Sequence, residues 1–62
     1  MNKEKAAKEY AQRALRHEYG FCPPKNQIAL YEIQFDGDAP QYVLFGIGGF
    51  KYSYDGFTLE RR

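Results

Sequence analysis

The stretch of sequence that decides the fold is residues 41–60, QYVLFGIGGFKYSYDGFTLE. Apolar and polar side chains alternate along much of it, which is the pattern of a β-strand with one buried face. Gly48-Gly49 suits a two-residue turn of the primed type, because both of its positions need positive φ. Asp55-Gly56 is a second strong hairpin signal. The stretch therefore predicts three antiparallel strands, at about residues 41–47, 50–54 and 57–60.

The two predicted turns agree on which side chains share a face of the sheet. The first turn pairs Ile47 with Phe50. The second pairs Tyr54 with Phe57. Directly opposed residues lie on the same face, and a slip of one residue would divide the set between the two faces. Both turns place the same eight side chains on one face, namely Val43, Phe45, Ile47, Phe50, Tyr52, Tyr54, Phe57 and Leu59.

Another strand is predicted immediately upstream, over residues 27–35. Its alternation places one set of side chains on a common face: Ala29, Tyr31, Ile33 and Phe35. Residues 36–40 read DGDAP, and this concentration of turn-forming residues predicts a loop. Four consecutive strands joined by short turns predict an antiparallel β-meander.

Residues 3–19 are predicted to form one helix. They contain no Pro, Gly or β-branched residue, and Ala, Lys, Glu, Arg and Gln predominate. Asn2 suits the N-cap, and Gly20 suits the left-handed position just after the helix. Pro23-Pro24 then prevents the helix from continuing. The predicted apolar stripe is thin, and consists of Ala7, Tyr10, Ala11, Ala14 and Leu15.

These elements predict an α+β fold, in which the N-terminal helix packs on one face of a four-stranded antiparallel meander. The 62 residues allow one domain, residues 1–62. Aromatic residues make up 18% of the chain, which is too many for a disordered segment, and no apolar run is long enough to cross a membrane. No secretory signal is evident, and the single cysteine excludes an intrachain disulfide, so we expect a cytoplasmic protein.

One helix covers one face of a sheet, and the other face is where we expect function. The predicted strands place four apolar side chains there, which would form one exposed patch: Ile28, Leu30, Tyr42 and Leu44. Contiguous apolar surface of this kind often marks an interaction site. Alternatively, a bulge in the first strand, or the segment 22–26 folded over the sheet, would remove the patch. We expect a non-enzymatic interaction module that binds a second copy or another protein.

Enzymatic and metal chemistry find little support in the residue types. His17 and Cys22 are the only imidazole and the only thiol, and they lie on either side of the predicted helix end with no evident oxyanion donor. Together with Asp36 and Asp38 they have no spacing typical of a metal site. We therefore expect no enzymatic activity, no cofactor and no metal.

Nucleic-acid binding is the alternative function. Four basic side chains lie on the outward side of the predicted helix, namely Lys5, Lys8, Arg13 and Arg16. Such a row suits contact with phosphates. However, the whole chain carries a net charge of only +1, from nine Lys or Arg and eight Asp or Glu, which is far from the strongly basic character of most nucleic-acid-binding domains.

Overall fold

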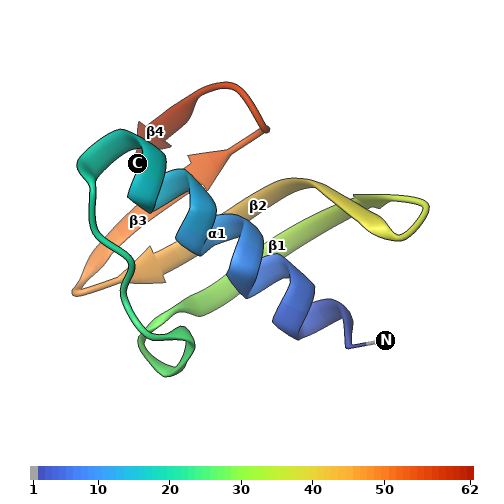
Figure 1. The fold of residues 1–62 in the computed structure, drawn as a ribbon, viewed down its shortest axis with the longest axis horizontal. Helices are drawn as coiled ribbons and strands as arrows, with labels where there is room; N and C mark the ends of the chain where they lie inside the picture. The colour runs from blue at the N-terminus through green and yellow to red at the C-terminus, as the bar shows by residue number, and fades with distance from the viewer. Residues whose placement is uncertain (1) are drawn as a thin grey trace.

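The computed structural model describes residues 2–62, and confirms the predicted fold class. One helix, α1 (Lys3–Tyr19), packs against a four-stranded antiparallel sheet of order β1-β2-β3-β4 (Figure 1). The strands are β1 (Ala29–Asp36), β2 (Ala39–Ile47), β3 (Phe50–Tyr54) and β4 (Leu59–Arg61). A single 3-10 turn, η1 (Lys25–Gln27), precedes β1.

The predicted helix ends are confirmed. The side chain of Asn2 accepts hydrogen bonds from the backbone N–H groups of Glu4 and Lys5, at 3.0 and 3.2 Å. These bonds satisfy donors that the first turn leaves without helical partners. Gly20 ends the helix with φ of 81°, and its N–H donates to the carbonyl of Arg16. Gln12 then fixes the following segment, because its side-chain amide donates to the carbonyl of Pro23 at 2.9 Å.

The core lies between α1 and one face of the sheet, which we call the inner face. Leu15, Val43 and Phe45 are its largest fully buried side chains, and the alanines of the predicted helix stripe are buried beside them. Tyr10 closes one side of this core, since its ring lies 5.0 Å from that of Tyr54 and its hydroxyl donates to the carbonyl of Gln41. Desolvation, with smaller contributions from Tyr54 and Asp55, raises the pKa of the Tyr10 hydroxyl.

The hairpin of β2 and β3 has the predicted register. Ile47 pairs with Phe50, and Phe45 pairs with Tyr52. Gly48 and Gly49 form the turn with φ of 59° and 84°, values that side chains other than glycine rarely adopt. This hairpin therefore confirms that the glycine pair determines the register at the centre of the sheet.

The connection between β3 and β4 differs from the prediction. Tyr54 pairs with Leu59 and not with Phe57, so residues 55–58 form a four-residue loop and β4 begins two residues later than predicted. The Asp55 side chain explains the difference, because Oδ1 accepts from the N–H groups of Phe57 and Thr58 at 2.9 and 2.8 Å. Phe57 consequently leaves the sheet and is 95% exposed.

Strand β1 also differs from the prediction, because it contains a bulge at Tyr31. Leu30 pairs with Phe45, whereas Glu32 pairs with Leu44, so Tyr31 is an extra residue with no partner in β2. A one-residue insertion reverses the face of every residue before it. Leu30 therefore lies on the inner face, while Tyr31 lies on the opposite face. A bulge in the first strand, which was one of the predicted alternatives, is therefore present.

Candidate functional site

The sheet face turned away from α1, here called the outer face, is the first candidate site. The connection between α1 and β1 lies on the helix side, since Pro23 bonds to Gln12 and Ile28 packs in the core. Within residues 2–62 no helix or loop is packed across the outer face (Figure 1). The strand register places these side chains on it: Ala29, Tyr31, Glu32, Gln34, Tyr42, Leu44, Lys51, Ser53, Glu60 and Arg62.

The predicted patch of four apolar residues does not form on this face. Ile28 is 3% exposed and belongs to the core cluster, and Leu30 packs against that cluster. The placement of these two residues on the outer face was therefore wrong, because the bulge at Tyr31 turns them toward the helix. Tyr42 and Leu44 do lie on the outer face, where both are half-buried.

Tyr31 takes the place of the two missing residues. Like Ala29, it was predicted to lie on the other face of the sheet. It is 57% exposed, and its ring lies over Gly46 in the neighbouring strand. A Cβ at position 46 would lie 2.9 Å from the Tyr31 ring, so only glycine allows this close approach. A glycine inside a strand is itself a signal for a bulge or a close approach, and Gly46 carried that signal.

Charged side chains border the aromatic part of the outer face. Lys51 Nζ lies 5.2 Å from the centroid of the Tyr31 ring, a cation–π distance. Arg62 donates from Nε to Ser53 Oγ at 3.0 Å, and the Ser53 side chain is almost fully buried. Glu32 accepts from the Gln34 amide. Neither of the two ion pairs found in residues 2–62 involves an outer-face residue.

A shallow depression opens on the outer face beside the Gly48-Gly49 turn. Its volume is about 220 Å³, and its wall includes Tyr31, Lys51 and Gln27. This volume is smaller than that of typical small-molecule pockets, which have about 300–1,000 Å³. The size of the depression suits one side chain of a macromolecular partner better than a whole cofactor.

The basic helix face that was predicted as an alternative site carries mixed charge. Lys5, Arg13 and Arg16 are exposed. Lys8 forms an ion pair with Glu4 at 3.4 Å, and Glu9, which lies among the basic residues, pairs with Lys25 at 3.6 Å. These pairs reduce the positive potential along the helix, and binding of nucleic acid there stays a prediction.

The residues considered for catalysis and metal binding are not brought together. Cys22 is exposed, and in the described chain no hydrogen bond joins it to His17. Among residues 2–62 no group of three or more His, Cys, Asp or Glu side chains has the arrangement of a metal site. No helix of these residues is both long and apolar enough to span a membrane.

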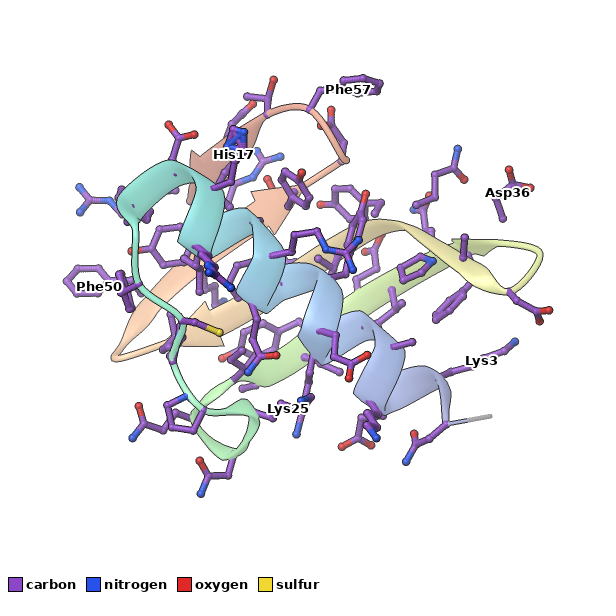
Figure 2. The ribbon with its side chains drawn as sticks, in the orientation of Figure 1. Lys3, His17, Lys25, Asp36, Phe50 and Phe57 are labelled. Atoms are coloured by element: carbon purple, nitrogen blue, oxygen red, sulfur yellow. The ribbon has the colours of Figure 1, made fainter. Side chains whose placement is uncertain are left out.

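Phe57 is the most exposed ring and stands clear of the molecule at the β3–β4 loop (Figure 2). Beside it, a hollow of about 190 Å³ separates the loop from α1 and is bordered by His17 and Leu59.

Comparisons with protein families, with curated proteins and with solved structures find no match.

Proposed function

We propose that this protein is a small, non-enzymatic interaction module that associates with a second copy of itself through the outer face of its sheet. The observation that carries the proposal is the exposed ring of Tyr31, which lies over Gly46 on the face that also carries Leu44 and Tyr42 and that no helix of residues 2–62 covers. Exposed apolar and aromatic surface with a polar rim is typical of interaction sites.

The charges of the outer face favour a second copy as the partner. Away from the β1–β2 turn, the face carries two basic residues, Lys51 and Arg62, and two acidic residues, Glu32 and Glu60, so the charges of this part balance. Glu32 belongs to β1 at one edge, whereas Lys51, Arg62 and Glu60 lie on or next to β3 and β4 and give the other side of the face a net positive charge. A two-fold axis between β2 and β3 would therefore bring Glu32 of one copy toward the basic edge of the other.

The small size of the chain sets the extent of this contact. A standard interface buries about 800 Å² on each partner. The accessible surface of the whole chain is 4327 Å², so such a contact would take about a fifth of it. The contact must then extend over most of the outer face, and would include Tyr42, Leu44 and the Tyr31 ring that lies over β2.

Sedimentation equilibrium over a range of protein concentrations tests the proposal. We expect the wild-type chain to form dimers, and we expect Tyr31→Ser and Leu44→Ser each to weaken dimerisation by about tenfold or more, because central aromatic and aliphatic contacts dominate interface energetics. Phe57→Ser is the matched control, since it removes an even more exposed ring that lies away from this face. The control variant should dimerise like the wild type.

Two results would overturn the proposal. The first is a monomeric wild type at millimolar concentration. The second is a dimer that keeps its affinity in Tyr31→Ser and Leu44→Ser but loses it in Phe57→Ser, because this would place the contact at the β3–β4 loop. Circular dichroism of each variant separates loss of association from loss of folding.

A further inference from the structure

Four aromatic rings gather where the end of α1 meets the start of β3, and three of them are half exposed. Tyr19 is 53% exposed, and Phe21 and Phe50 are each 52% exposed. The Tyr19 ring lies 6.3 Å from Phe21 and 6.3 Å from Tyr52, and Tyr52 stacks in turn on the buried Phe45 at 5.6 Å. Phe50 lies two residues before Tyr52 on the same face of β3. We call Tyr19, Phe21, Phe50 and Tyr52 the aromatic corner.

Arginine side chains stand beside these rings. The guanidinium of Arg61 lies 5.4 Å from the centroid of Phe50, and Arg61 is the register partner of Tyr52. Arg16 precedes Tyr19 by three residues, so the two are neighbours on the helix surface. One arginine is thus a helix neighbour of Tyr19, and another lies beside Phe50.

Further basic residues lie at the end of the molecule that carries the aromatic corner. Four of the nine Lys and Arg residues lie at this end, because Lys51 follows Phe50, and the Arg62 N–H donates to the Lys51 carbonyl at 2.8 Å. Two acidic residues, Asp36 and Asp38, lie at the β1–β2 turn. In Figure 2 Asp36 stands at the opposite end of the long axis from Phe50. Lys3 lies at the same end as Asp36 in Figure 2, so both ends carry positive charge, and the arginines beside the rings are what distinguishes the aromatic corner.

Two acidic side chains near this end do not face the aromatic corner. Glu60 pairs with Ser53 and lies on the outer face. Glu18 borders the hollow beside the β3–β4 loop, together with His17 and Leu59. Exposed rings with flanking arginines and no carboxylate among them match what a single-stranded nucleic acid needs, which is flat apolar surface for its bases and positive charge for its phosphates.

We propose that the aromatic corner, with Arg16 and Arg61, binds single-stranded nucleic acid by stacking bases on Phe50 and Tyr19 and pairing phosphates with the two arginines. This surface lies on the inner side of the sheet, so it is distinct from the outer face through which the module associates. It shares Arg16 with the basic helix face but differs from it, because here the rings supply base contacts that a row of basic side chains cannot.

Fluorescence anisotropy with labelled fifteen-nucleotide oligothymidine and oligouridine tests this proposal. We expect saturable binding at 50 mM salt to at least one of the two, and weaker binding to a duplex of the same length, whose paired bases cannot stack on the rings. Two phosphate contacts predict a slope of log affinity against log salt of about −1.4. The oligouridine arm shows whether RNA is preferred over DNA.

Paired variants locate the site. Phe50→Ala should weaken binding by about fivefold or more, and Arg61→Gln should also reduce the magnitude of the salt slope by about 0.7. Arg13→Gln on the exposed helix face and Phe57→Ala at the β3–β4 loop are the matched controls, and both should bind like the wild type. All four positions are exposed, so these variants should fold.

Three outcomes would overturn the inference: no binding at 50 mM salt, equal affinity for the duplex, or binding that Arg13→Gln weakens and Phe50→Ala leaves unchanged. None of these outcomes bears on dimerisation through the outer face, because that is measured without nucleic acid. Conversely, a monomeric protein could still bind nucleic acid at the aromatic corner. Each proposal can therefore be disproved without affecting the other.

Discussion

Gly46 determines the shape of the outer face, although it has no side chain of its own. The Tyr31 ring lies over it, and a methyl group at this position would meet the ring at 2.9 Å. The obstacle is the far end of a flexible side chain and not the backbone, and Gly46 does not have a positive φ. A substitution here should therefore move the ring and leave the strand intact.

We predict that Gly46→Ala and Tyr31→Ala are strongly coupled. In the wild-type background Gly46→Ala expels the Tyr31 ring, so the gain in strand propensity is offset by lost contacts and the free energy of unfolding changes little or falls. In the Tyr31→Ala background the same substitution should stabilise the protein by about 0.5–1 kcal/mol, because alanine restricts the unfolded chain more than glycine does. A double-mutant cycle by urea denaturation measures the coupling. Additive effects would show that the ring does not lie over Gly46.

Asp55 organises the β3–β4 loop through its charge. Hydrogen bonds from the backbone N–H groups of Thr58 and Phe57 hold the pKa of the Asp55 carboxyl below its ordinary value of 3.8. A carboxyl whose pKa is lower in the folded state stabilises the fold when it is ionised. This contribution is complete above the unfolded pKa, and is lost as the pH falls through the folded one.

We predict that the stability advantage of the wild type over Asp55→Asn is largest at neutral pH and shrinks in acid. Asparagine keeps an oxygen that can accept both bonds but lacks the charge that strengthens them. Urea midpoints of the two proteins, measured between pH 7 and about pH 2.5, should begin to converge below about pH 4 and should approach each other as the pH falls through the lower folded pKa of Asp55. A difference that stays constant over this range would contradict the charge-dependent role of the loop.

At the scale of elements, strand β1 determines which residues are available for binding. Its bulge turns Ile28 and Leu30 toward α1, and sends Tyr31 to the outer face. Without the bulge, the outer face would carry aliphatic side chains and the core would lack them. The same sequence in an unbulged register would therefore expose a different surface to a partner.

We predict that Ile28 acts in stability and Leu44 acts in association. Ile28→Ala should lower the free energy of unfolding by about 2–5 kcal/mol, because Ile28 is only 3% exposed and its removal leaves a cavity in the core. Leu44→Ala, at a half-buried position, should cost about 1 kcal/mol. Chemical denaturation at low micromolar concentration checks both values. Equal costs would mean that both side chains contribute equally to the core.

The elements themselves could be predicted from the sequence because their signals are local. Asn2 and Gly20 define the helix ends, and the Gly48-Gly49 pair defines the central hairpin, without information from the rest of the chain. The β1 bulge depends on Gly46 in another strand, and the Asp55 loop depends on a side chain that competes with a two-residue turn. These interactions decided the faces of Ile28, Leu30, Tyr31 and Phe57, which is why the candidate site could be predicted only in part.

At the scale of the whole molecule, a small core leaves a large share of the rings at the surface. Leu15, Val43 and Phe45 are the largest fully buried side chains, whereas five aromatic side chains are more than half exposed. A domain of this size buries only about 60% of the surface of its unfolded chain. The exposed rings lie in three places, namely the outer face, the aromatic corner and the β3–β4 loop, and the first two carry our proposals.

The order of the strands has a consequence for how quickly the chain folds. Each strand pairs with the strand that follows it in the sequence, so the whole sheet is assembled from neighbouring segments. The most distant parts of the chain are joined where α1 docks against the sheet. Mixed α/β domains fold at rates between those of helical bundles and those of all-β domains, and pairing of neighbouring strands favours the faster part of that range. We therefore expect the β2–β3 hairpin to form early and α1 to dock last. Docking of α1 would bury the core, and in the same step it would cover the inner face of the sheet and leave the outer face exposed.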